Sequence, residues 1–238
     1  MLAVKYQNYC LTRKLLQKSF VLSKKFCVKG QNGGGNFSKT IPKIFYVHNP
    51  LTFLWTRFQL ARMRLLWDRE FDLNEFCKGT KQAASVMTDF IRKQDQLSIG
   101  HFTTPIGYEQ ITNDMNFSKN DARIKLLHFR FEDIHRAVPV HVVFFKKGNN
   151  KNCFIDMLFV GMRNTKDFQN SEERQVISRT LDQLERQMNV PPDVIPAKHR
   201  VIFSEIYMRF FRNYTPRVPG DWSVSFYKIV SFDVWNFV

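Results

Sequence analysis

The spacing of apolar residues predicts helices in the first half of the chain and strands in the second. Residues 51–67 contain neither Gly nor Pro, and they follow Asn49-Pro50, a pair that favours the start of a helix. Farther along, apolar residues recur at helical spacing after residues that can cap a helix. The predicted helices are 51–67, 72–93, a short helix that starts at Thr104-Pro105, another from Ser118 to about Leu127, and 172–189.

Short runs rich in Val, Ile and Phe dominate from His128 onward, which is typical of β-strands. Pro139 argues against one continuous strand across the first two runs, because proline cannot donate a ladder hydrogen bond. Gly148-Asn149-Asn150 is predicted to be the turn of a hairpin. Helices followed by an antiparallel sheet indicate an α+β fold, with N-terminal helices on one face of a curved, cone-like sheet that has a hydrophobic groove. The predicted strands are 128–138, 140–147, 153–162, 199–214 and 222–234.

The strongest local signal is the start of the helix at 72–93. Asp72 can cap this helix, and Glu75 can reach back to Asp72 to complete a capping box. Phe71 before the cap and Phe76 at the fourth helical position form the matching hydrophobic staple. Gly79 costs about 1 kcal/mol relative to Ala inside a helix, so we expect another element to pack closely against it. The apolar face is predicted to comprise Phe76, Ala83, Val86, Met87 and Phe90.

Positive charge is concentrated at the N-terminus. The chain has 36 Lys and Arg against 21 Asp and Glu, a formal charge of +15, yet its first acidic residue is Asp68. Residues 1–67 hold twelve of the basic residues, which leaves +3 for 68–238, where 24 basic residues face 21 acidic ones. A basic, acid-free leader that contains Ser and Thr is typical of import into a mitochondrion. The alternative is a disordered basic tail of a nuclear or ribosomal protein.

The leader and the remainder of the chain are expected to be separate parts. Residues 31–35 have the Gly-rich composition of a flexible linker. No apolar run precedes a small-residue cleavage site, and no stretch reaches the roughly 18–20 apolar residues of a membrane-spanning helix. We therefore predict a mitochondrial presequence and linker at 1–43 and a single α+β domain at 44–238.

The Cys, His and Gly residues form no recognisable catalytic, metal or cofactor pattern. Cys77 and Cys153 belong to no CxxC pair and are expected to be buried, reduced thiols. His135 and His141 lack a spacing typical of metal ligands. The Gly run at 33–35 lacks the preceding strand and the following Lys-Ser or Lys-Thr of a phosphate loop.

The remaining titratable residues are expected to be isolated or solvated. Glu132-Asp133 and Glu172-Glu173 are adjacent pairs whose side chains diverge, on a strand or on a helix. Four further histidines have no partner in the sequence pattern, namely His48, His101, His128 and His199. We therefore predict no catalytic, metal or cofactor-binding residues, and no enzyme.

The helix at 51–67 is the best candidate for an interaction surface. Arg57 and Arg64 share a face, seven residues apart, while Arg62 lies on another. Trp55 and Phe58 add apolar area. A basic helix with aromatic residues can lie in a membrane interface, where each Lys or Arg contributes about 1 kcal/mol of attraction to anionic lipid. The alternative is that the helix packs on the sheet with its arginines in solvent.

The strands are more apolar than burial of one face requires. Some of their side chains could line a groove for a client helix, whereas the simpler explanation is an aromatic core partly covered by the helix at 172–189. The residues concerned are Val140, Val142, Phe144, Ile202, Phe203, Ile206, Met208, Phe210 and Phe211.

Residues 68–83, with the sequence DREFDLNEFCKGTKQA, resemble the start of the conserved domain in matrix AAA peptidase-interacting proteins. That family is related to the C-terminal domain of the mitochondrial import-motor anchor and to a membrane-facing mitoribosomal large-subunit protein. The family pattern is D-x-E-F-S-x-x-E-F-x-x-G-A-K-Q-A, and this chain departs from it at Asp72, which retains the capping chemistry, and at Thr80. The matching residues are Asp68, Glu70, Phe71, Glu75, Phe76, Gly79, Lys81, Gln82 and Ala83.

The resemblance implies a non-enzymatic protein of the mitochondrial matrix that is peripheral to the inner membrane. Such a protein binds the matrix AAA protease and helps newly imported inner-membrane proteins escape misdirected proteolysis. The small regulator subunit of the calcium uniporter is the notable client. The resemblance also implies the cone-like fold of the import-motor anchor's C-terminal domain, whereas capping and packing alone account for the motif itself.

Two other functions stay open at this point. A tether between the mitoribosome and the inner membrane would contact RNA and lipid, but a charge of only +3 over 68–238 disfavours nucleic acid. A small-ligand enzyme is disfavoured because no convergent titratable pairs are evident. A deep pocket that holds an Asp-His pair would favour the enzyme.

Overall fold

The structure, a computed structural model, describes residues 50–117, 121–168, 171–187, 199–216 and 220–237. The chain divides into one unit at 1–55, described only over 50–55, and a second unit at 56–238. The predicted boundary between residues 43 and 44 lies outside the described residues. The packing discussed below belongs to the second unit, and residues 50–55 begin a helix that continues into it.

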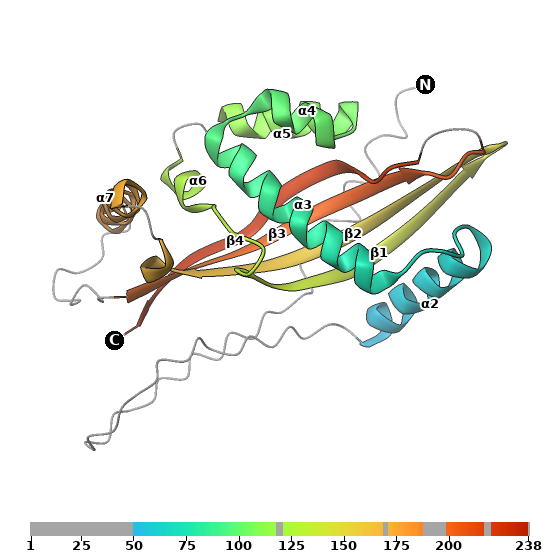
Figure 1. Cartoon of the computed structure of the whole chain (residues 1–238), viewed down its shortest axis with the longest axis horizontal. Coiled ribbons are helices and arrows are strands. Elements are labelled where there is room, and N and C mark those ends of the chain that lie inside the picture. The colour runs from blue at the N-terminus through green and yellow to red at the C-terminus, as the bar shows by residue number, and fades with distance from the viewer. Residues whose placement is uncertain (1–49, 118–120, 169–170, 188–198, 217–219, 238) are drawn as a thin grey trace, which may run out of the picture. The chain divides into compact units, whose positions relative to one another are not determined.

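Four long strands form one antiparallel sheet in which each strand pairs with the next along the chain (Figure 1). Gly148, with a φ of 59°, lies in the tight turn that joins the first two strands, as predicted. Helices together with this four-stranded antiparallel sheet make the fold α+β. The strands are β1 (Ile134–Lys147), β2 (Asn150–Asn164), β3 (His199–Asn213) and β4 (Ser223–Phe237).

The predicted break at Pro139 is wrong, because β1 runs through it as one strand. β1 is an edge strand, so Pro139 can lie where no neighbour needs its missing N–H, and the pairing with β2 shifts register between Pro139 and His141. The strand also begins later than predicted, at Ile134, since residues 128–133 form an irregular segment and a turn.

The helices agree with the predictions at 51–67, 72–93 and 105 onward, and differ at two places. A short helix at 96–102 was missed, although Asp95 caps it by accepting hydrogen bonds from the Ser98 N–H at 3.1 Å and from its hydroxyl at 2.6 Å. The helix expected from Ser118 is capped by Asp121, while Ser118 itself lies outside the described residues. The helices are α2 (Pro50–Leu66), α3 (Leu73–Lys93), α4 (Gln96–Phe102), α5 (Pro105–Phe117), α6 (Ala122–Leu126) and α7 (Ser171–Gln187), with a 3₁₀ turn at Thr165–Asp167.

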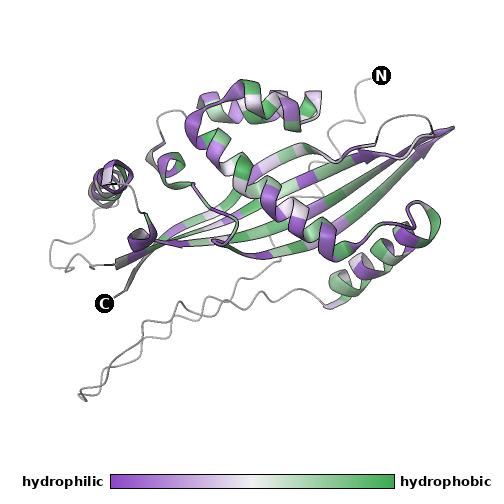
Figure 2. Ribbon diagram, viewed as in Figure 1, coloured by the Kyte–Doolittle hydropathy of each residue, from purple (hydrophilic) through white to green (hydrophobic). Residues whose placement is uncertain are grey.

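α3 crosses one face of the sheet diagonally to the strands (Figure 1) and carries both hydrophobic and hydrophilic residues (Figure 2). The predicted apolar face is only partly right: Phe76 and Met87 are buried, but Ala83, Val86 and Phe90 are half-buried. The face is rotated because two threonines bond back to carbonyls one turn earlier and can therefore be buried. The buried residues of α3 are Phe76, Thr80, Ala84, Met87, Thr88 and Ile91.

β2 and β3 are buried on both faces along their central parts. Ile155 and Met157 point toward α3 and belong to the main hydrophobic cluster, to which α7 contributes Ile177 and Leu181. Alternate residues such as Leu158 point to the opposite face and are also buried, with Leu158 only 4% exposed. The strongly apolar composition of these strands therefore reflects burial on two faces.

Candidate functional site

The motif at 68–83 forms the turn before α3 and the first half of that helix. The Asp72 carboxylate accepts hydrogen bonds from the N–H of Asn74 at 2.7 Å and of Glu75 at 2.9 Å, which confirms the predicted cap. The Phe71 and Phe76 rings lie 5.4 Å apart, which confirms the staple. The Glu75 carboxylate does not accept a hydrogen bond from the Asp72 N–H, so the predicted capping box is only half formed.

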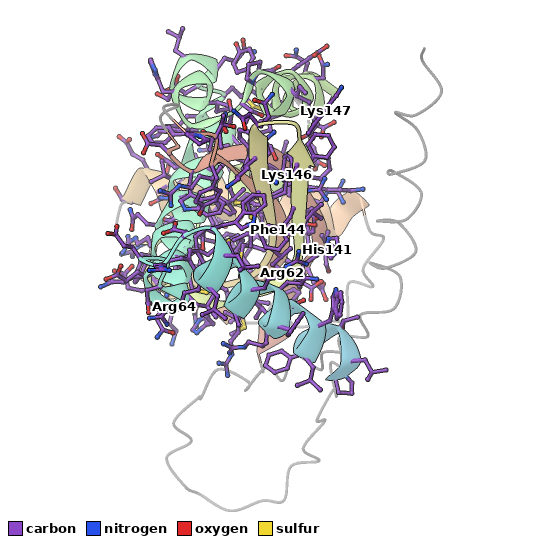
Figure 3. All side chains as sticks on the ribbon, turned by 90° about the vertical axis from the view of Figure 1, so that its right-hand side faces the viewer. Arg62, Arg64, His141, Phe144, Lys146 and Lys147 are labelled. Carbon is purple, nitrogen blue, oxygen red and sulfur yellow. The ribbon has the colours of Figure 1, made fainter. Side chains whose placement is uncertain are left out.

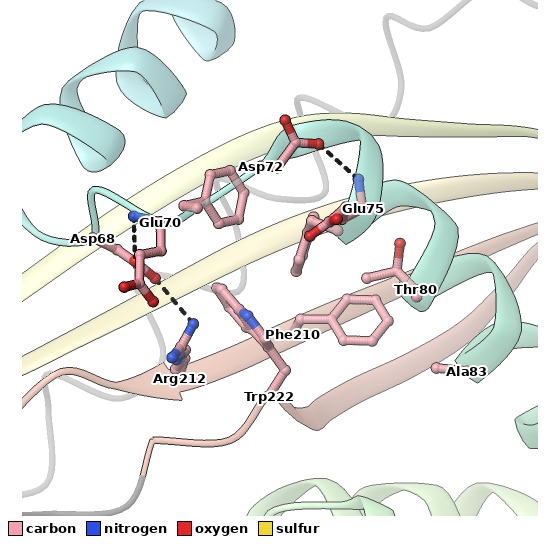
Figure 4. A pocket seen from close by; sticks show the side chains of 12 residues that line it. Asp68, Glu70, Asp72, Glu75, Thr80, Ala83, Phe210, Arg212 and Trp222 are labelled. Atoms are coloured by element: carbon pink, nitrogen blue, oxygen red, sulfur yellow. Dashed lines mark hydrogen bonds and ion pairs between the residues drawn. The ribbon is translucent and has the colours of Figure 1, made fainter.

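The same motif lines a pocket between the start of α3 and the paired ends of β3 and β4 (Figure 4). Its volume is about 480 Å³. The Trp222 ring lies 4.7 Å from the Phe76 ring and Phe210 lies 5.9 Å from it, so aromatic rings form the floor. The lining residues are Asp68, Glu70, Phe71, Asp72, Glu75, Phe76, Gly79, Thr80, Ala83, Phe210, Arg212 and Trp222.

The polar lining of this pocket is predominantly acidic, with four carboxylates against the single guanidinium of Arg212. Asp68 accepts hydrogen bonds from Arg212 at 3.0 Å and from the Tyr214 hydroxyl at 3.0 Å. Asp72 is engaged in capping α3. The carboxylates of Glu70 and Glu75 are exposed and have no hydrogen-bond or ion-pair partner among the described residues.

Gly79 does not pack against another element, contrary to the prediction. A Cβ built on it would meet no heavy atom within 4 Å, and Gly79 lines the pocket. The glycine therefore borders open space. Close approach occurs instead at Gly107 of α5, where a Cβ would lie 2.7 Å from the Val224 carbonyl oxygen of β4.

Replacing Gly79 with Ala is expected to raise the free energy of unfolding by about 0.5–1 kcal/mol. Alanine removes the entropic cost of glycine in a helix, and its methyl group enters unoccupied space. Urea unfolding followed by circular dichroism measures the change. Gly107→Ala is the matched control and should destabilise the protein; a loss of stability in Gly79→Ala would show that the site is packed after all.

The other two motif residues lie away from the pocket. The Lys81 ammonium sits 4.1 Å from the centre of the Phe131 ring, so it fastens the loop before β1 to α3. Burial lowers the pKa of Lys81, while Glu132 and Asp133 oppose this shift. Gln82 is exposed. The contact with Phe131 explains Lys81, whereas no contact in the described residues explains Gln82.

α2 turns its larger apolar residues outward. Its buried side chains are Thr56, Gln59, Leu60 and Met63, and the Thr56 hydroxyl donates to the Val140 carbonyl of β1 at 3.1 Å. Trp55 and Phe58, both singled out from the sequence, are each 58% exposed. The other exposed large apolar residues of α2 are Leu51, Phe53, Leu54, Leu65 and Leu66.

The outward face of α2 has an apolar stripe with arginines on both sides. Leu54 and Leu65 lie on one line, since eleven residues make three turns of a helix. At the same periodicity Arg57 and Arg64 fall on one side of this line and Arg62 on the other. All three arginines are exposed, and the Arg62 guanidinium lies 5.8 Å from the centre of the Phe144 ring.

The basic surface of α2 extends to β1. Figure 3 shows Arg62 and Arg64 on the same side of the molecule as Lys146 and Lys147, which end β1. Both lysines are exposed. Lysines at the end of an edge strand also discourage pairing with another sheet, so a purely protective role explains these two on their own.

A buried polar cluster that the sequence does not predict lies on the sheet face opposite α3. Asp156 of β2 is 2% exposed, and its carboxylate binds the Arg209 guanidinium of β3 at 2.6 and 3.0 Å. His141 of β1 approaches the same carboxylate at 3.4 Å, and the Tyr207 hydroxyl accepts from Arg209 at 3.4 Å. Burial alone would raise the pKa of Asp156, but hydrogen bonds from His141 and Arg209 outweigh it and hold that pKa below its usual value.

This Asp156–His141 pair is not the pair that would favour an enzyme. Both carboxylate oxygens are bound by Arg209, and the described residues place no Ser, Thr or Cys in hydrogen-bond contact with His141. Neither residue lines the pocket at α3. The cluster ties three neighbouring strands together.

A second buried polar cluster centres on Arg163, which is 1% exposed at the end of β2. Its guanidinium donates to the His128 carbonyl at 2.9 Å, lies 3.6 Å from the centre of the Phe168 ring and approaches Asp133 at 3.5 Å. Glu173 of α7 contacts His128 Nδ1 at 3.0 Å. The prediction that the acidic pairs are solvated is therefore wrong for Asp133 and Glu173, and His128 is not isolated.

Both cysteines of the second unit are free thiols, as predicted. Cys153 is fully buried beside Met63, and burial raises the pKa of its thiol to about 12. Cys77 was also predicted to be buried but is only half-buried, and this partial burial raises its pKa too. Within the described ranges, no group of three or more His, Cys, Asp or Glu could hold a metal ion. No helix in those ranges is both long and apolar enough to cross a membrane.

No family model, curated protein or solved structure matches this chain. Two surfaces of the described residues are candidates for a function: the acidic pocket built by the motif at 68–83, and the basic apolar face of α2.

Proposed function

We propose that this protein is a non-enzymatic adaptor of the mitochondrial matrix, peripheral to the inner membrane. It binds the matrix AAA protease and assists the sorting and protection of newly imported inner-membrane proteins, such as the small regulator subunit of the calcium uniporter. The observation that carries the proposal is the motif at 68–83, in which nine residues match the family pattern and Asp72 preserves the capping chemistry. The predicted presequence at 1–43 is basic and contains no acidic residue, which supports import.

The finer fold assignment is part of the same proposal. We infer that the sheet is of the cone-like type found in the C-terminal domain of the import-motor anchor. The helices α2 to α6, which precede the first strand, and the single antiparallel sheet of β1 to β4 support this assignment.

The outward face of α2 is the proposed contact with the inner membrane. An apolar stripe flanked by arginines suits an interfacial helix, because the apolar residues enter the acyl boundary while the guanidinium groups reach the lipid phosphates. The exposed Lys146 and Lys147 extend the positive surface on the same side (Figure 3). Since Asp68 is the first acidic residue of the chain, no carboxylate on α2 opposes the attraction.

Replacing Arg57, Arg62 and Arg64 together with Gln is expected to weaken binding to cardiolipin-containing vesicles about 100-fold. Each arginine contributes about 1 kcal/mol near an anionic surface, so three contribute about 3 kcal/mol. Co-sedimentation with vesicles over a range of salt concentrations measures the loss, and the wild-type protein should lose affinity as salt increases.

A matched control removes the same charge elsewhere, by replacing Lys166, Arg179 and Lys228 with Gln. These residues are exposed and lie outside α2. Their replacement should leave vesicle binding within a few-fold of wild type. Equal losses in the two triple variants would mean that net charge, rather than the face of α2, controls membrane binding.

Purification of the tagged protein from detergent-solubilised mitochondria, with mass spectrometry of its partners, tests the adaptor proposal. Recovery of matrix AAA protease subunits together with small inner-membrane proteins is the expected result. Recovery of large ribosomal subunits without the protease would instead favour a mitoribosome-to-membrane tether.

A further inference from the structure

The geometry points to the pocket at the start of α3 as a binding site for a basic, apolar segment of a partner protein. A Lys or Arg side chain of that segment lies against Glu70 and Glu75, and an apolar neighbour rests on Trp222 (Figure 4). That the partner is an imported client rests on the proposed function, whereas the chemistry of the segment rests on the pocket alone.

The space in the pocket is the first argument. A volume of about 480 Å³ falls within the range of about 300–1,000 Å³ that is typical of ligand sites, so a cation and an apolar group can enter together. Gly79 borders this space, and no heavy atom lies within 4 Å of the position that a Cβ would take. A larger side chain at this position would therefore occupy part of the pocket. A glycine in the middle of α3 is otherwise unfavourable, and no packed element requires it.

The charge of the lining is the second argument. Arg212 forms an ion pair with Asp68 at 3.0 Å, whereas the carboxylates of Glu70 and Glu75 are left to face a ligand. Two free carboxylates beside an aromatic floor attract cations and repel phosphate, so anionic lipid and nucleic acid do not suit the site. The pocket is negatively charged, whereas the face of α2 is positively charged. The pocket is therefore suited to a positively charged partner.

Titration calorimetry of the full-length protein with the blocked hexapeptide Lys-Leu-Phe-Arg-Leu-Lys tests the inference. We expect saturable binding that weakens with salt, and at least tenfold weaker binding when the Lys and Arg of the peptide are replaced with Gln. Equal affinity for the charged and the Gln-substituted peptides would overturn the inference.

Variants of the protein locate the binding. The double variant Glu70→Gln, Glu75→Gln should bind at least tenfold more weakly, and Gly79→Leu, which fills the pocket, should abolish binding. Glu109→Gln removes an exposed charge on α5 and should bind like wild type. Unchanged affinity in either pocket variant, with a circular dichroism spectrum that shows it is folded, would overturn the inference.

The two proposals fail separately. If the peptide binds in the pocket but the AAA protease does not co-purify, the site stands and the adaptor function falls. If the protease co-purifies but no peptide binds, only the pocket assignment is lost.

Discussion

Replacing Asp156 with Ala is expected to lower the free energy of unfolding by about 3 kcal/mol, because removal of one partner leaves a charge in the sheet without its counter-ion. Asp156 is 2% exposed, and both of its oxygens bind Arg209. The loss falls at the lower end of the usual range of about 3–5 kcal/mol, since the Arg209 side chain is 31% exposed and can recover some hydration.

Chemical denaturation at neutral pH measures this loss, with Asp182→Ala, an exposed residue of α7, as the control within about 0.5 kcal/mol of wild type. The difference should also depend on pH. The folded protein holds the pKa of Asp156 below the usual value of an Asp carboxyl, so this carboxylate stabilises the fold at pH values above that usual pKa. The advantage of wild type should shrink as pH falls through the folded-state pKa. A difference that is small at pH 7, or constant into acid, would contradict this account of the cluster.

The second large effect is expected at Arg163, where replacement with Ala should destabilise the protein by about 3 kcal/mol. The guanidinium is 1% exposed, stacks on Phe168 at 3.6 Å and donates to the His128 carbonyl at 2.9 Å. Truncation to Ala removes these contacts and leaves a cavity. It also removes the ion pair between Arg163 and the Asp133 carboxylate, which lie 3.5 Å apart.

Arg163→Met separates packing from charge, because methionine fills most of the same volume without a charge. Two guanidinium nitrogens of Arg163, Nε and Nη2, are buried without a hydrogen-bond partner, and burial lowers the pKa of Arg163, so a well-packed apolar residue should be tolerated better. We expect Arg163→Met to lose less than half as much stability as Arg163→Ala in urea unfolding. Equal losses in the two variants would mean that the ion pair and hydrogen bond, rather than packing, account for the effect.

The sequence predicts best those features that depend on neighbours along the chain. The cap at Asp72 and the Phe71–Phe76 staple involve groups within four residues of one another, and both are present. The turn at Gly148 follows from the conformational freedom of glycine. The α+β class follows from the order of the helical and strand-like patterns along the chain.

Features that depend on pairing across the sheet could not be predicted in the same way. Asp156, Arg209 and His141 lie on three strands, and only the register of those strands brings them together. Pro139 was expected to break a strand, but its edge position removes the conflict, and edge position is a property of the topology. Asp133 and Glu173 were expected to be in solvent because their partners, Arg163 and His128, are distant from them in the sequence.

Helix faces were predicted less well than helices. The bounds of α2 follow from its sequence, but its polar Thr56 and Gln59 turn inward. Thr56 donates to the Val140 carbonyl, whereas the Gln59 side-chain oxygen has no partner among the described residues. Gly79 was expected to mark a close contact and instead borders a pocket. Whether a glycine serves packing or open space depends on what lies opposite, which only the fold determines.

The most direct test of the adaptor function is the half-life of the newly imported regulator subunit of the calcium uniporter in mitochondria that lack this protein. Pulse-labelled import followed by a chase measures it. We expect faster degradation, restored to the normal rate by the wild-type protein and also by removal of the matrix AAA protease. An unchanged half-life, or faster degradation that persists without the protease, would contradict it.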